Sequence, residues 1–176
     1  MSRLMKLSSL MAIVALLTIT AVSFAQDGDE ITLTGVNMGT HVAGPELDAD
    51  DLAGKVVVFE YWGHQCPPCI ASIPHINGLR EEYDADKVAI VANQVWTRDV
   101  GEARKVWEDN NGSEDITVVN HGGVRGVQVR GVPHAFVFDH EGKMVWRGNP
   151  HPRAGGPEMD AAIEAAVEAI PDSEEN

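Results

Sequence analysis

Residues 56–69 read VVVFEYWGHQCPPC, and this stretch decides the fold. Its first seven residues are β-branched or aromatic apart from Glu60, which is the pattern of a strand buried on both faces of a sheet. Apolar residues then recur at helical spacing, which predicts a helix over about residues 66–84. Two prolines directly after Cys66 fit the first turn of that helix, where backbone N–H groups have no intrahelical partner. The stretch therefore places a C-x-x-C pair where a central strand meets a helix N-terminus.

The rest of the chain supplies further strands and helices around this unit. Residues 31–36 alternate apolar and polar side chains and predict a leading strand. Thr97 or Asp99 is placed to cap a second helix. The order of elements predicts an α/β protein with a mixed central β-sheet, helices on both of its faces and an N-terminal β extension. The other predicted elements are strands at residues 87–95 and 116–119, helices ending near residue 111 and spanning 155–170, a glycine-rich loop at 121–130, and a hairpin of strands at 134–139 and 143–147.

Residues 1–25 have the features of a secretory signal peptide. Arg3 and Lys6 precede an apolar run without charges at residues 7–22, and small residues stand before Gln26 where a signal peptidase cuts. An uncleaved leader that anchors the chain in a membrane is the alternative, although the run is shorter than the ~20 residues of a spanning helix. We therefore predict an exported protein, periplasmic or otherwise extracytoplasmic, with one domain at residues 26–170 and an acidic flexible tail at 171–176.

The chain is acidic, with 27 Asp and Glu residues against 13 Lys and Arg residues and a formal net charge of −14. Such a surface repels phosphate backbones and anionic lipid headgroups, so the charge argues against a nucleic-acid partner. Its simplest consequence is solubility, and a cationic partner surface is the alternative.

The chain contains two cysteines, Cys66 and Cys69, and export places them where disulfides persist. A bridge between residues three apart constrains little entropy of the unfolded chain, so a purely structural disulfide is a poor explanation. A helix N-terminus favours the thiolate, which is the reactive form of cysteine. We expect Cys66 to be the more exposed attacking thiol and Cys69 to be the buried thiol that resolves the mixed disulfide.

Two motifs resemble those of the thioredoxin superfamily. Residues 62–69, WGHQCPPC, resemble its W-x-x-x-C-x-P-C site, and residues 129–133, VRGVP, resemble the cis-proline loop that faces it. The predicted export, the leading strand and the extra segment between residues 93 and 121 resemble features of the TlpA/ResA branch of this superfamily. The resemblance covers about residues 31–170 and implies a thioredoxin-like fold.

The resemblance also implies roles for individual residues. Pro133 is the expected cis-proline, and the backbone of Val132 would pair with a substrate chain like an added strand. Glu60 matches a buried acid that relays a proton to the resolving cysteine, unless it is solvated at a strand edge. Substrate contacts are expected at Trp62, Pro67 and Pro68, although Trp62 also suits packing beside the site.

This sequence departs from the branch at two positions. Ser72 stands three residues after Cys69, where some members carry an acid, so that Glu60 must supply any acid used. Pro67 removes a backbone donor from the first helical turn, which leaves the Cys66 thiolate less stabilised. We therefore expect a reductant or a mid-potential exchanger rather than a strong oxidant.

The predicted function is disulfide exchange with protein substrates through the Cys66–Cys69 couple, without a cofactor or a resident metal. By resemblance, apocytochrome c or a metallochaperone is a plausible substrate, and a reductant needs a membrane electron donor. One alternative is a Cu(I) metallochaperone that adds His64 or His134 to the two thiolates. A thiol peroxidase is a weaker alternative, because the site lacks a lone peroxidatic cysteine in a threonine-and-proline setting.

Overall fold

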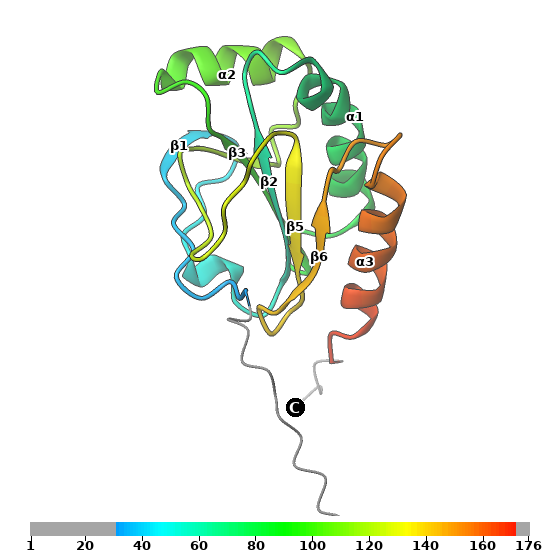
Figure 1. The fold of residues 1–176 in the computed structure, drawn as a ribbon. Helices are drawn as coiled ribbons and strands as arrows, with labels where there is room; N and C mark the ends of the chain where they lie inside the picture. The colour runs from blue at the N-terminus through cyan, green and yellow to red at the C-terminus, as the bar shows by residue number, and fades with distance from the viewer. Residues whose placement is uncertain (1–30, 172–176) are drawn as a thin grey trace, which may run out of the picture.

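The computed structural model describes residues 31–171, which form one mixed six-stranded sheet with three α-helices (Figure 1). The strands lie in the order β1-β4-β3-β2-β5-β6. β3 is parallel to β2 and β4, whereas β1, β5 and β6 run antiparallel to their neighbours. The elements in chain order are β1 (Thr40–Ala43), the 3₁₀-helix η1 (Asp50–Leu52), β2 (Val56–Trp62), α1 (Pro67–Glu82), β3 (Val88–Gln94), α2 (Val100–Asp109), β4 (Thr117–Asn120), β5 (His134–Phe138), β6 (Met144–Gly148) and α3 (Gly156–Glu168).

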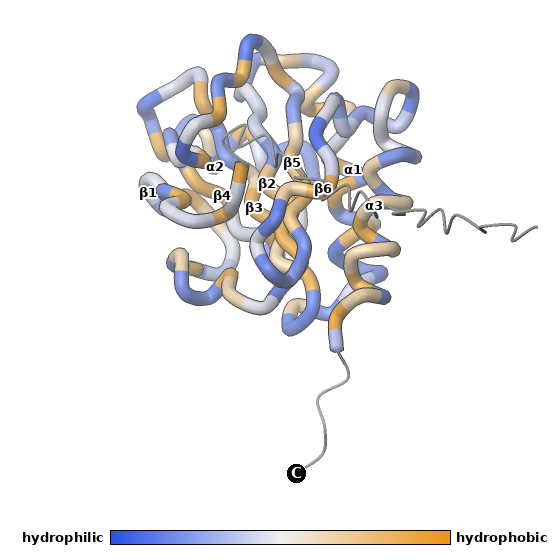
Figure 2. Tube along the Cα trace, turned by 60° about the horizontal axis from the view of Figure 1, so that its bottom comes forward, coloured by the Kyte–Doolittle hydropathy of each residue, from blue (hydrophilic) through white to orange (hydrophobic). Residues whose placement is uncertain are grey.

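β2 is the strand on which the site is built, and all seven of its residues are buried. It pairs in parallel with β3 along its whole length and antiparallel with β5 from Val57 to Tyr61. Figure 2 shows hydrophobic residues along β2, β3 and β5 at the centre and hydrophilic residues on the outer turns. A strand paired on both edges and covered on both faces is the one that the apolar run predicted.

The alternation of β2 divides the core into two clusters, one on each face of the sheet. Val56, Val58 and Trp62 belong to the helix-side cluster, which contains the two cysteines and buried apolar side chains from all three α-helices. Val57, Phe59 and Tyr61 belong to the loop-side cluster, which is closed by Leu52 of η1 and by side chains from residues 31–38 and 124–132. Helical cover therefore differs from the prediction: the α-helices pack into one cluster, whereas η1 and irregular segments cover the other face.

The first two helices begin where the sequence predicted, α1 next to Cys66 and α2 after one of its two candidate caps. Cys66 is the N-cap of α1, and Asp99 is the N-cap of α2, where its carboxylate accepts the Glu102 N–H at 3.1 Å. The predicted loop at residues 121–130 forms no helix or strand.

The predicted strand at residues 31–36 is wrong. The Val36 N–H donates to the Leu33 carbonyl and closes a turn there, and the segment makes single bridges at Thr32 and Asn37 instead of a ladder. The N-terminal strand is β1, which pairs with β4 at the sheet edge. Alternation alone misplaced it because a strand also needs a continuous partner.

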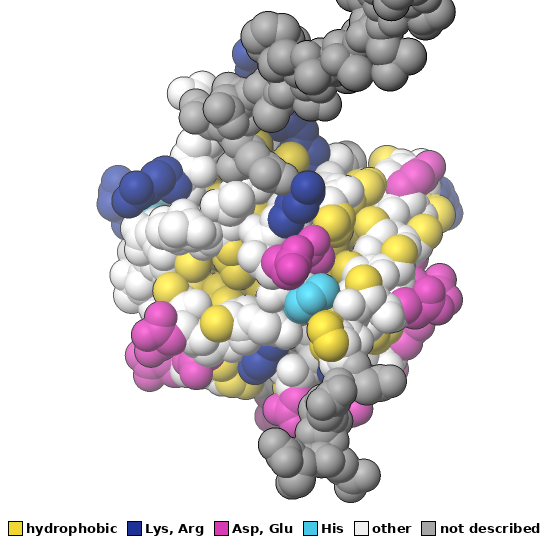
Figure 3. All heavy atoms as spheres, turned by 90° about the horizontal axis from the view of Figure 1, so that it is seen from below, with side chains coloured by type: hydrophobic (Ala, Val, Ile, Leu, Met, Phe, Trp, Pro, Cys, Tyr) yellow, Lys and Arg dark blue, Asp and Glu magenta, His cyan; other side chains and the backbone are white. Residues whose placement is uncertain are grey.

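The predicted leader at residues 1–25 lies outside the described residues, and so does the tail beyond Pro171. Within residues 31–171, none of the helices has the length and apolar character needed to cross a bilayer. Figure 3 views the end of the molecule that carries the β5–β6 turn, where acidic side chains lie scattered, one group near the centre beside a histidine and the others toward the edges, rather than in one patch.

Candidate active site

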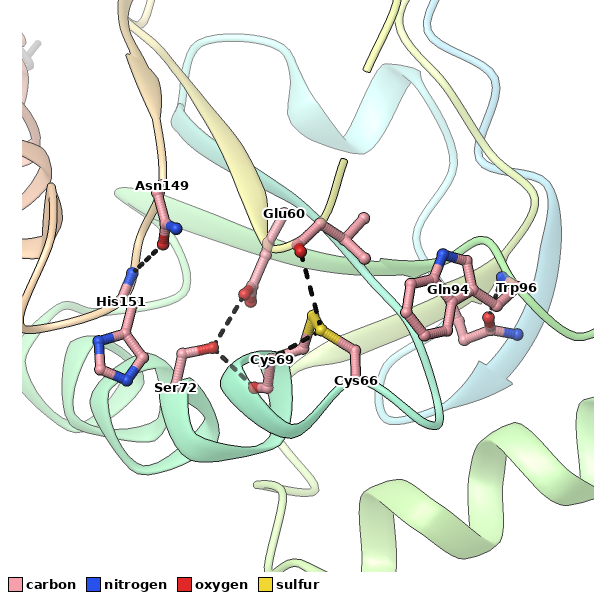
Figure 4. Close-up of a disulfide and its surroundings, with 9 residues drawn as sticks. Glu60, Cys66, Cys69, Ser72, Gln94, Trp96, Asn149 and His151 are labelled. Carbon is pink, nitrogen blue, oxygen red and sulfur yellow. Dashed lines mark hydrogen bonds between the residues drawn. A yellow bond between two sulfur atoms is a disulfide. The ribbon is translucent and has the colours of Figure 1, made fainter. Parts of the chain in front are cut away.

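The two cysteines form a disulfide across the first turn of α1 (Figure 4). Their Cα atoms are 5.2 Å apart, and Cys66 caps the helix while Cys69 lies inside it. The Cys69 N–H points at the Cys66 Sγ at 3.3 Å. When the bond is reduced, this amide and the helix dipole both favour a thiolate at Cys66.

Pro67 and Pro68 form the outer surface of this turn. Both are exposed, and both stand in the first turn of α1 where a missing N–H costs nothing. Among the described residues, the Cys69 N–H is the only hydrogen-bond donor to the Cys66 Sγ. A partner that approaches the disulfide from outside therefore meets the two proline rings.

Both cysteines are buried in the oxidised structure, Cys66 with 2% and Cys69 with 1% of its surface exposed. Exposure therefore does not separate the two sulfurs as sharply as the sequence argument expected. Their neighbours do distinguish the two residues, because the Cys66 Sγ faces the Val132 carbonyl before β5, whereas the Cys69 carbonyl accepts a hydrogen bond from Ser72 inside α1.

The segment before β5 crosses in front of the disulfide. The Val132–Pro133 peptide bond is cis, and the Val132 carbonyl oxygen lies 3.8 Å from the Cys66 Sγ. Val132 is half-buried and Pro133 is buried. Antiparallel pairing of β5 with β2 brings the end of this segment, residues 131–133, beside the helix tip.

Glu60 lies on β2, and its side chain points to the helix-side face of the sheet, toward Ser72 of α1 (Figure 4). It is 3% exposed, so the solvated alternative is wrong. Burial raises the pKa of Glu60 from 4.5 to about 8, and a hydrogen bond from Ser72 partly opposes this rise. The carboxyl group therefore changes charge near neutral pH, in the range where an acid–base group is useful.

Ser72 is the group that sequence reasoning missed. It is fully buried, and its Oγ lies 3.2 Å from Glu60 Oε1 and 2.7 Å from the Cys69 carbonyl oxygen. A hydroxyl has one proton to donate, so these two acceptors compete for it whenever Glu60 is ionised. The C-x-x-C-x-x-S spacing was visible in the sequence, but the contact with β2 was not.

Trp62 packs in the core instead of lining the surface. It is 2% exposed, and its ring centroid lies 5.7 Å from that of Trp107. The exposed aromatic residue at this end is Trp96, which is 54% exposed and lies against Gly63. The Oε1 atom of the buried Gln94 accepts hydrogen bonds from the N–H groups of Trp96 and Thr97, which fixes the turn that carries Trp96.

A shallow groove of about 280 Å³ runs beside the cis-proline segment. It is mostly apolar, and its hollow is large enough for one side chain of a partner chain. The groove is lined by Tyr61, Val95, Trp96, Val129, Arg130, Gly131 and Val132.

The two histidines considered as copper ligands do not gather at the sulfurs. His64 Nε2 lies 3.4 Å from Glu102 Oε1, and its Nδ1 is buried without a partner among the described residues. His134 pairs with Tyr61 in the register, on the loop-side face, and its ring lies 4.9 Å from that of Phe136. Residues 31–171 contain no group of three or more His, Cys, Asp or Glu side chains that could hold a metal ion. No observation on the described residues therefore favours the copper alternative.

The fold and the site together define a thioredoxin-like protein with a C-x-x-C disulfide at a helix N-terminus and a cis-proline opposite it. The chain belongs to the Redoxin family, whose profile matches residues 26–163. It is a TlpA/ResA-like member of the thioredoxin superfamily.

Two bacterial relatives illustrate the match. The chain is 30% identical over 110 residues to the thiol-disulfide oxidoreductase ResA of Bacillus anthracis. This aligned stretch covers 60% of this chain and 61% of the relative. It is 25% identical over 103 residues to the thioredoxin-like protein YneN of Bacillus subtilis, which is 57% of this chain and 60% of the relative. The chain thus spans about three fifths of the length of these relatives.

Solved structures share the fold at lower sequence identity. A thiol-disulfide isomerase from Corynebacterium glutamicum superposes with a TM-score of 0.62 at 15% identity, over 75% of this chain and 93% of that one. A secreted Mycobacterium tuberculosis disulfide oxidoreductase, described as homologous to DsbE, superposes with a TM-score of 0.57 at 23% identity, over 76% and 96% of the two chains.

The buried Glu60 makes a prediction about stability. Its pKa is 4.5 in the unfolded chain and about 8 in the folded one, so between these values folding takes up a proton. The contribution of Glu60 to stability is therefore complete below pH 4.5 and is lost as pH rises toward 8, by at most about 1.4 kcal/mol per pH unit. Glu60→Gln removes this slope, and the gap between wild type and variant in urea unfolding of the oxidised proteins shifts in favour of the variant from pH 5 to pH 8.

Glu81→Gln, at an exposed position of α1, is the control and keeps the pH dependence of wild type. Parallel stability curves for wild type and Glu60→Gln across this range would contradict the buried, titrating carboxyl group.

Proposed function

We propose that the chain is an exported thiol–disulfide oxidoreductase that exchanges disulfides with protein substrates through Cys66 and Cys69. The observation that carries the proposal is the disulfide at the N-terminus of α1 with the Val132 carbonyl 3.8 Å from its outer sulfur. The match to the Redoxin family and to relatives named thiol-disulfide oxidoreductase supports it.

The proposed reaction begins from the reduced pair. The Cys66 thiolate attacks a substrate disulfide, one substrate sulfur leaves as a thiolate and takes up a proton, and a mixed disulfide remains. Cys69 then loses its proton and attacks the Cys66 sulfur, which releases the second substrate thiol. Two electrons pass from the cysteine pair to the substrate, and the Cys66–Cys69 bond closes.

The substrate chain is proposed to lie along the cis-proline segment. The Val132 backbone is free to pair with an extended chain, because Pro133 has no N–H and β5 begins only at His134. Pro67 and Pro68 would contact it from the helix side, while the groove beside Trp96 would hold an apolar side chain. Trp62 would support this surface from beneath.

Glu60 is proposed to accept the proton of Cys69 in the resolving step. Its carboxyl group is connected to the turn of Cys69 by Ser72, which is hydrogen-bonded to both. A pKa of about 8 lets the group hold a proton in one step and release it in the next near neutral pH.

The direction of transfer proposed is reduction of substrates or exchange at an intermediate potential. Pro67 leaves the Cys69 N–H as the one described amide donor to the Cys66 Sγ, so the thiolate is stabilised less than in strong oxidants. A reductant outside the cytoplasm would need a membrane electron donor, and apocytochrome c or a metallochaperone would be its substrate. Export rests on the leader features of residues 1–25.

Trapping tests which cysteine attacks. We expect Cys69→Ser, once reduced, to accumulate a covalent adduct with insulin that dithiothreitol releases, because the mixed disulfide cannot be resolved. Cys66→Ser should form little adduct and should reduce insulin at the background rate of dithiothreitol alone, whereas wild type reduces it faster. Non-reducing electrophoresis and mass spectrometry measure the adducts. Equal trapping by the two variants, or wild-type insulin reduction at background, would refute the proposal.

The link through Ser72 tests the proton step. Removing the hydroxyl removes the hydrogen bond that lowers the pKa of Glu60, so Ser72→Ala raises that pKa further. In stopped-flow measurements of mixed-disulfide resolution between pH 6 and 10, the rising limb should move to higher pH in Ser72→Ala. Glu60→Gln should lack this limb, and adding Ser72→Ala to it should change nothing more. Identical profiles for wild type and Ser72→Ala would rule out the link.

A further inference from the structure

A second hollow lies on the other side of the cis-proline segment, on the loop-side face of the sheet. Its volume is about 550 Å³, and we call it the basic pocket. It is lined by Ile31, Gly126, Val127, Gln128, Arg130, Gly131, His134, Phe136 and Arg147. No Asp or Glu is among these residues, although acidic residues outnumber basic ones two to one in the chain.

The sheet register explains how one wall of the basic pocket forms. Phe136 of β5 pairs directly with Arg147 of β6, so their side chains share a face, and His134 lies two residues before Phe136 on that face. The His134 and Phe136 rings are 4.9 Å apart. This wall therefore presents a cation and an imidazole above an aromatic floor.

Loop residues 126–131 form the opposite wall and carry Arg130. Among residues 31–171, neither Arg130 nor Arg147 has an ion pair or a side-chain hydrogen bond, and both are exposed. Burial and the positive charge of Arg147 lower the pKa of His134. The two guanidinium groups thus face a common hollow without an acidic partner in the described part of the chain.

The basic pocket adjoins the candidate active site. Arg130 and Gly131 line both the basic pocket and the groove beside Trp96. Arg130 is two residues from Val132, or about 7 Å along an extended chain. A substrate chain paired with Val132 would therefore pass the mouth of the basic pocket two to four residues from its reacting cysteine.

We propose that the basic pocket binds an acidic side chain of the substrate polypeptide and so selects substrates with Asp or Glu near the reacting cysteine. Guanidinium groups hold carboxylates through paired hydrogen bonds, which gives this selection its geometry. The proposal rests on the proposed function and adds a substrate class to it.

The overall charge of the protein makes the test sharp. A formal net charge of −14 repels an acidic peptide, so long-range electrostatics alone would slow its reaction. At physiological salt the screening length is about 8 Å, so a contact in the basic pocket survives while the distant repulsion is weakened. Faster reaction with an acidic peptide than with a neutral one is therefore the opposite of what the net charge alone would produce.

Kinetics with matched peptides measure this preference. Two fluorogenic peptide disulfides differ only in carrying Asp or Asn at the positions two, three and four residues from the cysteine. We expect wild type to reduce the Asp peptide with a kcat/KM about twofold to fivefold higher, the range of an exposed ion pair. Arg147→Gln and Arg130→Gln should lose the preference, and Arg147→Gln should keep the wild-type rate with the Asn peptide. Arg153→Gln, an exposed arginine outside the basic pocket, should keep the preference.

A binding measurement separates this inference from the enzymatic proposal. In oxidised wild type, a cysteine-free heptapeptide with the same three Asp residues should raise the pKa of His134, because a bound carboxylate offsets the charge of Arg147. The Hε1 chemical shift of His134 measures this, and the Asn heptapeptide is the control. Equal kcat/KM values for the two substrates, faster reduction of the Asn peptide, or an unchanged His134 titration would overturn the inference. Failure to reduce either substrate, together with a shifted His134 titration, would overturn the proposed function and leave the basic pocket standing.

Discussion

Hydrogen bonding of β2 along both of its edges fixes the position of every group at the site. Pairing with β3 and β5 holds the strand at the centre of the sheet, and its last residue leads within four residues to Cys66. Pairing with β5 also brings Val132 and Pro133 to the same end of the sheet. The disulfide therefore lies next to the cis-proline segment because β2 leads directly to Cys66 and also pairs with β5, the strand that follows Pro133.

β2 also carries one residue, Glu60, that lowers the stability of the fold and is proposed to act at the site. Glu60 is the one charged residue of β2, and a buried carboxyl group without full solvation destabilises the fold when it ionises. The protein avoids this cost below about pH 8 by holding the group neutral, and Ser72 moderates it with one hydrogen bond. An apolar residue such as Val or Phe at position 60 would give a more stable fold but would leave no acid near the disulfide.

How much the sequence could predict depended on whether a feature was local. The apolar run before Cys66 predicted β2, and of the two caps expected for α2, Thr97 and Asp99, the structure has Asp99. Residues 31–36 misled because their alternation lacked a strand partner, which the sequence does not specify. The Ser72–Glu60 hydrogen bond and the shared pocket of Arg130 and Arg147 were out of reach, since both depend on how separate elements pack. The orientation of His134 away from the sulfurs followed from the register of β5, which one residue of slip would reverse.

The proposed function requires that the Cys66–Cys69 bond is a working redox couple and not a structural bridge. The most direct test is the reduction potential of this couple, measured by equilibrating the purified protein with glutathione or dithiothreitol buffers. We expect one reversible two-electron transition between the superfamily extremes of roughly −270 and −120 mV and away from the oxidising end. A potential below about −300 mV, as in structural disulfides, or a bond that does not reform after reduction, would contradict it.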